Sequence, residues 1–145
     1  MRFMMIVKAS KDSEAGKMPT EELLAAMGTY NEQLMKAGVL VDLAGLQPTS
    51  KGARVKFSNG KPTVIDGPFA ETKELIGGYW IIQAKSREEA IEWAKQAPAP
   101  HGTGQEGEIE IRQFFELEDF APSETIERER EMMKELETKR QSNIG

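Results

Sequence analysis

The stretch VIDGPFAETKELIGGYW, Val64 to Trp80, decides how the middle of this chain folds. It begins as a strand-like run, breaks at DGPF (66–69), and returns to a strand-like run after a charged segment. Asp and Gly favour turns, and Pro fixes φ and removes a backbone donor, so the first strand has to end there. The stretch therefore predicts two strands joined by a structured turn.

A second turn precedes this one, at Asn59-Gly60. The pair lies between two short strand-like runs, 53–57 and 62–65. Both residues tolerate the positive φ angles that a two-residue hairpin turn needs. The sequence therefore predicts a β-hairpin that leads directly into the DGPF turn.

Two strand–helix–strand units flank the hairpin. In the first, four apolar residues recur at helical spacing and predict one buried stripe: Leu23, Met27, Tyr30 and Leu34. In the second, Ser86 and Glu89 form a capping-box pattern at a helix start. The expected strands are 2–9, 39–46, 77–84 and 107–117, the expected helices are 19–37 and 86–97, and 10–18 is expected to be a polar loop. This order predicts an α+β fold of the ferredoxin-like, split β-α-β type with an inserted β-hairpin.

The predicted sheet has an apolar surface that its helices do not cover. Two helices cover only one face, and the alternation of side chains along the strands places apolar residues on both. In the last strand, Ile109, Ile111 and Phe115 are expected on one face. The residues expected on the face without helices are Met4, Ile6, Tyr79, Ile81 and Phe114. Contiguous apolar surface usually marks an interface, so we expect a homodimer packed sheet to sheet.

The composition changes near the carboxyl end, and two domains are expected, 1–120 and 121–145. From Pro122 onward Glu, Lys and Arg dominate, and Ile126, Met133 and Leu136 form only a thin apolar stripe. This pattern is typical of a solvated helix or of a helix that lies on a partner subunit.

Bulk composition narrows the classes of function. The chain has 145 residues, a net charge of -5 and no cysteine. The charge, and the lack of a Lys/Arg cluster, argue against a nucleic-acid partner. Without cysteine, and with one histidine, a conventional metal site is not expected, and no cofactor is predicted. The apolar runs are too short to span a bilayer and the amino terminus is typical of a strand, so no membrane partner and a cytoplasmic location are expected.

Four blocks of sequence together resemble a known family. They are RFMMIVKAS near the amino terminus, DGPFAETKELIGGYWII in the middle, and SREEAIEWAKQAP and GEIEIRQF further on. In combination they resemble the DGPF branch of the YCII-related family over about residues 1–117. The resemblance implies a dimeric α+β barrel of ferredoxin-like subunits. It also implies relatives that act on small cyclic or aromatic compounds as dehydrochlorinases and isomerases, and a link of many members to sigma-factor genes.

Asp66 and His101 are the candidate catalytic residues. Asp66 matches the family motif and is interpreted either as a turn residue that accepts backbone amides or as an acid or base at the mouth of a barrel. His101 lies in a loop beyond a helix and has the side chain whose pKa is nearest neutrality. It is interpreted either as a proton-transfer group or as a loop histidine without a role.

Four residues are candidates for substrate binding: Arg112, Arg54, Tyr79 and Trp80. Arg112 is predicted on the outer face of the last strand, where it needs a carboxylate, either of the protein (Glu110 or Asp42) or of an anionic substrate. The two aromatic residues are expected either to line a cleft or to belong to the core or an interface.

Two function hypotheses follow from the sequence. The first is an enzyme that acts on a small anionic or cyclic molecule by proton transfer in a barrel cleft. The second is a non-catalytic, dimeric ligand-binding or regulatory module, linked by the resemblance to sigma-factor regulation. The sequence leaves open which applies, and it does not identify a ligand.

Overall fold

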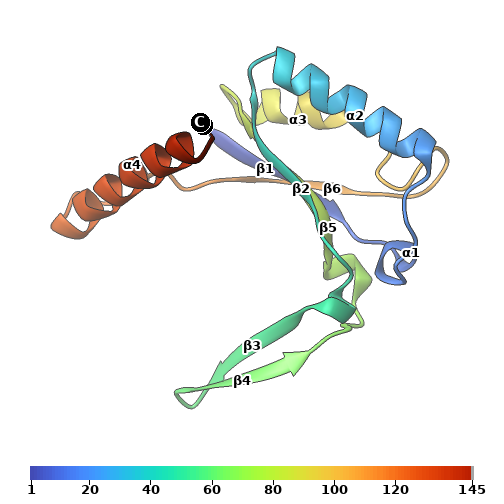
Figure 1. The fold of residues 1–145 in the computed structure, drawn as a ribbon, viewed down its shortest axis with the longest axis horizontal. Helices are drawn as coiled ribbons and strands as arrows, with labels where there is room; N and C mark the ends of the chain where they lie inside the picture. Colours follow the sequence, from blue (N-terminus) through green and yellow to red (C-terminus); the bar gives the residue numbers. More distant parts are fainter. Residues whose placement is uncertain (145) are drawn as a thin grey trace. The chain divides into compact units, whose positions relative to one another are not determined.

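The structure is a computed structural model that describes residues 1–144 (Figure 1). Its strands are β1 (Arg2–Lys8), β2 (Leu40–Gly45), β3 (Ala53–Ser58), β4 (Lys61–Asp66), β5 (Ile76–Gln83) and β6 (Ile109–Gln113). Its α-helices are α1 (Lys11–Glu14), α2 (Glu21–Lys36), α3 (Arg87–Lys95) and α4 (Glu124–Ile144). Three short 3-10 helices are η1 (Thr49–Lys51), η2 (Thr72–Glu74) and η3 (Leu117–Asp119).

The main sheet has four strands in the order β2-β5-β1-β6, and all neighbouring strands are antiparallel. The central pair places Met4 opposite Ile81 and Ile6 opposite Tyr79. This topology confirms the ferredoxin-like α+β prediction. Within residues 1–144 the sheet does not close into a barrel, because β2 and β6 each pair on one side only. A barrel therefore requires a second copy and stays a prediction.

The core lies between one face of this sheet and the helices α2 and α3, which run over the same face in Figure 1. Of the stripe predicted on α2, Tyr30 and Leu34 are buried and Leu23 and Met27 are partly buried, and α3 contributes Ala90. The strands contribute Phe3, Met5, Trp80 and Ile82. The Tyr30 hydroxyl donates a 2.6 Å hydrogen bond to the carbonyl of Trp93, and burial raises the pKa of Tyr30 to about 12. This bond ties α2 to α3.

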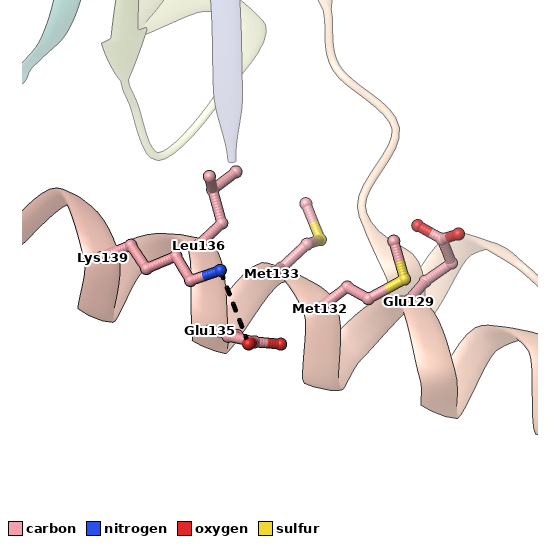
Figure 2. Close-up of a pocket in the computed structure, with 6 residues that line it drawn as sticks. All are labelled: Glu129, Met132, Met133, Glu135, Leu136 and Lys139. Carbon is pink, nitrogen blue, oxygen red and sulfur yellow. Dashed lines mark ion pairs between the residues drawn. The ribbon is translucent and has the colours of Figure 1, made fainter.

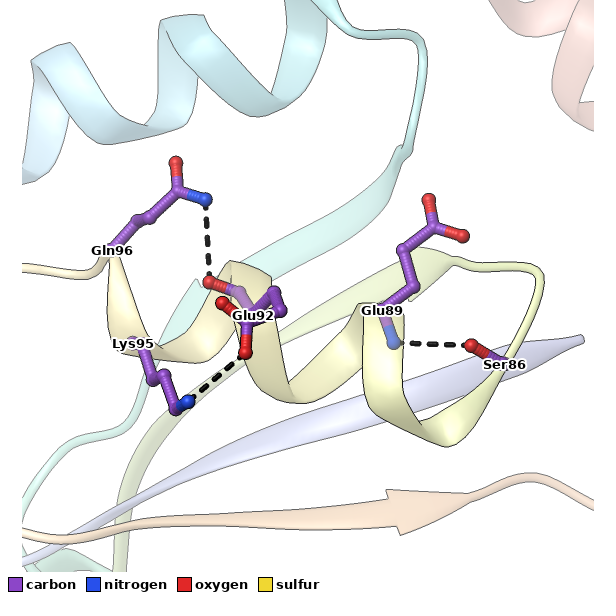
Figure 3. Close-up of polar contacts among 5 residues, drawn as sticks. All are labelled: Ser86, Glu89, Glu92, Lys95 and Gln96. Atoms are coloured by element: carbon purple, nitrogen blue, oxygen red, sulfur yellow. Dashed lines mark hydrogen bonds and ion pairs between the residues drawn. The ribbon is translucent and has the colours of Figure 1, made fainter.

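The start of α3 has one of the two hydrogen bonds of the predicted capping box, the one made by the Ser86 side chain (Figure 3). The Ser86 hydroxyl accepts a hydrogen bond from the Glu89 amide, and the Glu89 carboxylate accepts one from the Lys85 amide. The bond to Ser86 satisfies one of the amides left free at the helix start, and the bond from Lys85 fixes the residue that precedes the N-cap. Further along, Lys95 forms an ion pair with Glu92 at 3.0 Å, one turn away on the exposed side.

Two predictions of local structure are wrong. The expected loop 10–18 contains the short helix α1, because Ser10 and Ser13 form a reciprocal capping box. The last strand ends at Gln113, so Phe114 and Phe115 are not strand residues. The Asp119 carboxylate accepts the Glu116 amide and starts η3, and Phe115, 75% exposed, instead contacts Phe120 with ring centroids 5.3 Å apart.

The inserted hairpin β3–β4 forms its own two-stranded sheet, which we call the ribbon. Asn59 and Gly60 have φ angles of 53° and 76°, as the predicted turn requires. The pairing gives the ribbon two unlike faces. One face carries Val55, Phe57, Pro62 and Val64, and the other carries Arg54, Lys56, Lys61, Thr63 and Ile65. Every residue of both strands is exposed.

Chain contacts divide the molecule into two compact units, Met1–Gln113 and Phe114–Gly145. In the second unit, α4 is joined to η3 by an ion pair of 3.0 Å between Arg130 and Glu118. The Arg130 guanidinium lowers the pKa of the Glu118 carboxylate. In the part of the chain that the structure describes, none of the helices combines the length and apolar character needed to cross a membrane.

Candidate functional site

The DGPF turn is held by the segment that connects β2 to β3. The Phe69 amide donates to the Thr49 hydroxyl at 3.0 Å, and the Gly67 amide donates to the Gly52 carbonyl at 3.0 Å. A Cβ atom at Gly67 would overlap the carbonyl oxygen of Thr49, so this position admits only glycine without rearrangement. The Gly67-Pro68 peptide bond is cis.

Thr49 is held in turn by Glu14, at the end of α1. The Glu14 carboxylate accepts one hydrogen bond from the Thr49 amide, at 3.0 Å, and another from the Thr49 hydroxyl. All of these groups are partly buried. A chain of contacts therefore runs from α1 through Thr49 to Phe69, and it fixes the turn without using Asp66.

Asp66 is the last residue of β4 and lies opposite Ala53. Its side chain is exposed, and no hydrogen bond or ion pair reaches its carboxylate from residues 1–144. The interpretation that Asp66 ends the strand by accepting backbone amides is therefore wrong, because the Thr49 hydroxyl takes that role. The carboxylate is left available for solvent or a ligand.

Arg54 lies beside the same turn. Its guanidinium carbon is 3.7 Å from the centre of the Phe69 ring, the geometry of a cation–π contact. Within the described part of the chain it forms no ion pair, so its charge is not neutralised by a protein carboxylate. Neighbouring cross-strand pairs alternate in direction, so Arg54 and Asp66 leave the ribbon on opposite faces.

His101 lies in the connection between α3 and β6 and is half-buried. Its Nε2 atom is 3.0 Å from the carbonyl oxygen of Lys8. A carbonyl oxygen only accepts hydrogen bonds, so Nε2 carries the proton and donates. In the neutral ring, Nδ1 is then an unprotonated acceptor, and no other residue within 1–144 is bonded to it.

An apolar hollow of about 320 Å³ adjoins His101, between α3 and β6. Its lining includes Ile91, Ala94, Pro98, Pro100, Gly107 and Ile109. Gly107, in this lining, is close to the histidine, since a Cβ atom built there would lie 3.3 Å from Cδ2 of His101. Gly107 therefore lies next to the Cδ2 side of the imidazole, which is the side of the ring away from Nδ1.

Arg112, which was expected to need a carboxylate partner, forms an ion pair with a carboxylate of the protein. It forms a 3.5 Å ion pair with Glu110, and its side chain is 72% exposed. Glu110 also pairs with Lys8 at 3.2 Å, and the Lys8 ammonium, more than Arg112, lowers the pKa of the Glu110 carboxylate. Lys8 therefore contributes both its carbonyl, to His101, and its side chain, to this charged cluster.

Tyr79 and Trp80 point to opposite faces of the sheet. Trp80 is 5% exposed, lies in the core edge-to-face with Tyr30, and donates from Nε1 to Asn31 at 2.7 Å. Tyr79 lies on the other face, between Ile6 and Ala44. One cleft cannot be lined by both residues.

The structure thus connects Asp66, through its turn, with Arg54, and it places His101 at the end of β1 beside Lys8. Sequence reasoning missed Glu14, Thr49 and Lys8. The Ser-x-x-Ser spacing at Ser10 is a local signal that could have predicted α1, but no local pattern indicates contacts made 35 and 93 residues away along the chain. Within residues 1–144, no group of three His, Asp or Glu side chains is placed to hold a metal ion.

Comparison with known proteins identifies the family of this chain. The family model described as the YCII-related domain matches residues 1–118. An uncharacterized protein of Rhizobium meliloti (strain 1021) is 35% identical over 86 residues, which cover 59% of this chain and 69% of that protein. The match to the family model spans most of the chain and both halves of the ferredoxin-like unit. The chain therefore belongs to the YCII-related family.

Proposed function

We propose that the protein catalyses proton transfer on a small cyclic or anionic organic molecule, with His101 as the base. The observation that carries the proposal is the hydrogen bond from His101 Nε2 to the Lys8 carbonyl. A general base needs a free acceptor atom and a fixed orientation, and this bond supplies both at Nδ1.

The hollow beside His101 supports the class of substrate. Its lining is mainly Ala, Pro, Gly and Ile, which suits a flat or cyclic carbon skeleton. Lys95 lies on the same lining and offers a cation for a carboxylate or enolate oxygen, because its pair with Glu92 is exposed and therefore weak.

Asp66 and Arg54 belong to the proposal as a second pair of groups at the ribbon base. The exposed Asp66 carboxylate is available to move a proton, and the unneutralised Arg54 is available to hold negative charge. They lie on a different element from His101, so the proposal assigns the first proton transfer to His101 alone.

The assembly that we propose is a homodimer formed through the sheet face opposite the helices. Met4, Ile6, Tyr79 and Ile81 form a contiguous apolar group there by strand register. The proposed location is cytoplasmic, on the basis of composition.

The test begins with a thermal-shift screen of small lactones, phenols and carboxylic acids. Compounds that bind are then incubated with the protein in D2O, and deuterium exchange at their acidic C–H positions is followed by NMR. We expect His101→Gln to bind the same compounds and to lower the exchange rate by about a hundredfold. Gln105→Ala, in the same loop, is the matched control and should exchange at the wild-type rate.

Unchanged exchange in His101→Gln would refute the assignment of the base.

The second candidate function is a non-catalytic ligand-binding or regulatory module, and the observation in its favour is that no interaction joins His101 to Asp66 in the described residues. Binding without exchange in the wild-type protein would favour that candidate.

A further inference from the structure

The carboxyl-terminal helix α4 carries an exposed patch whose residues are arranged symmetrically about its midpoint. Met132, Met133 and Leu136 are each about half exposed, and Leu136 lies four positions after Met132 and three after Met133, the spacings of neighbours on a helix surface. Glu129 and Lys139 close the patch at its two ends (Figure 2). These residues, with Glu135, line a shallow hollow of about 370 Å³. We call this group the α4 patch.

Two residue pairs of the α4 patch become complementary when the helix is placed against an antiparallel copy of itself. Lys134 is the middle residue of the helix Glu124–Ile144. Met132 and Leu136 lie two positions to either side of it, and Glu129 and Lys139 lie five positions to either side. A second α4 that runs antiparallel about this midpoint therefore matches Met132 with Leu136 and Glu129 with Lys139, twice each.

We propose that the α4 patch binds the α4 patch of a second copy of this chain, with the two helices antiparallel. A two-fold contact places the same patch on both partners, and it requires a surface that complements itself. The α4 patch meets this requirement in its Met132–Leu136 and Glu129–Lys139 pairs, while Met133 lies level with Glu135. A parallel pair would instead place Glu129 beside Glu129 and Lys139 beside Lys139, which is repulsive.

The existing contacts of the charged residues leave them able to pair across copies. Within its own helix, Lys139 lies 3.7 Å from Glu135, but both side chains are about 70% exposed. Such an exposed pair contributes little and exchanges readily with solvent. Glu129 has no ion pair among the described residues, so its carboxylate is available to a second chain.

This contact does not depend on the proposed proton transfer or on the sheet interface. Because the natural chain has no cysteine, one introduced cysteine reports one contact. Met133→Cys lies in the patch, next to the two-fold axis, and Lys134→Cys lies on the opposite side of the same helix. Under mild oxidation of the full-length chain, we expect Met133→Cys to form a covalent dimer at least about tenfold faster than Lys134→Cys, because only the first pair of sulfur atoms meets.

Charge reversal tests the antiparallel register. In the Met133→Cys background, Glu129→Lys alone or Lys139→Glu alone should slow cross-linking by about threefold or more, since each creates two like-charge contacts. A mixture of the two variants should recover the original rate, because both pairs are again opposite in charge. Equal rates for Met133→Cys and Lys134→Cys, or no recovery in the mixture, would overturn the proposal.

Discussion

Glu14 and Thr49, 35 residues apart, are joined by two hydrogen bonds to one carboxylate. Thr49 in turn receives the Phe69 amide, so this pair fixes the DGPF turn from outside the motif. The acidic residue that holds the turn is therefore Glu14 of α1, and the Asp66 carboxylate does not contribute.

The first prediction compares how much the Thr49 contacts and the Asp66 carboxylate each contribute to the stability of the fold. Thr49→Val removes the acceptor of the Phe69 amide and the donor to Glu14, so we expect a loss of about 1–3 kcal/mol in the free energy of unfolding. Asp66→Ala should change it by less than about 0.5 kcal/mol, because its exposed carboxylate has no partner to lose. Urea unfolding of both variants measures this. A larger loss for Asp66→Ala than for Thr49→Val would contradict the described turn.

The second prediction compares two glycines. Gly67→Ala should destabilise the protein by about 1–3 kcal/mol, since its Cβ overlaps the Thr49 carbonyl. Gly28→Ala, within α2, is the matched control: a Cβ there has no atom within 4 Å, and alanine should stabilise the helix by about 0.5–1 kcal/mol. Opposite shifts in melting temperature are expected, and a stabilising Gly67→Ala would show that the turn is more open than described.

The third prediction concerns alkaline pH. Burial raises the pKa of Tyr30 to about 12, above its ordinary value of 10.0. The folded state therefore favours the neutral hydroxyl over the phenolate. The stability that this preference adds to the fold is fully present below pH 10 and is lost as the pH rises towards 12. We expect the melting temperature to fall over this range less steeply in Tyr30→Phe than in the wild type. Tyr30→Phe should also cost about 0.5–1.5 kcal/mol at neutral pH through the lost bond to Trp93. Equal slopes for the two proteins would contradict the raised pKa.

The fourth prediction uses the single histidine as a spectroscopic probe. His101 should give one set of imidazole signals, and at alkaline pH its ¹⁵N shifts should show the proton on Nε2, because the Lys8 carbonyl accepts from that atom. Long-range ¹H–¹⁵N correlation spectra measure the tautomer without any substrate. A predominant Nδ1–H form would remove the basis for His101 as a base.

The fifth prediction tests the proposed sheet-to-sheet dimer. Ile81→Glu places a carboxylate in the centre of the apolar face, where an interface would have to bury it, so we expect the sheet contact to be lost and the mass of the assembly to fall, with only the proposed α4 contact left to join copies. Thr63→Glu adds the same charge to the polar face of the ribbon and should leave the dimer intact. Light scattering at micromolar concentration measures both. A wild-type protein that is already monomeric under these conditions would exclude the interface.

Features with a local cause could be predicted from the sequence. The Ser86 cap, the Asn59-Gly60 turn and the Tyr30–Leu34 stripe each depend on residues within one or two turns of each other. The strand extension over Phe114 and Phe115 was wrong because apolar alternation continues past Gln113, although the Asp119 cap turns the backbone there.

The contacts of the candidate site could not be predicted in this way, because they join residues that are distant in sequence. The Lys8 carbonyl that orients His101 is a backbone group 93 residues away, and such a group has no signature in a side-chain pattern. Strand alternation, in contrast, already implied that the neighbours Tyr79 and Trp80 face opposite ways.

The ribbon has a consequence for the way this molecule opens. A two-stranded hairpin with no covering layer is marginally stable, and β3 and β4 pair only with each other. Their cross-strand amides should therefore exchange with deuterium through local opening, much faster than those of β1 and β5, which require global unfolding. A protease should find its first cleavage site near Asn59-Gly60 and leave the four-stranded sheet folded, so the ribbon tip is the natural place to insert a peptide tag.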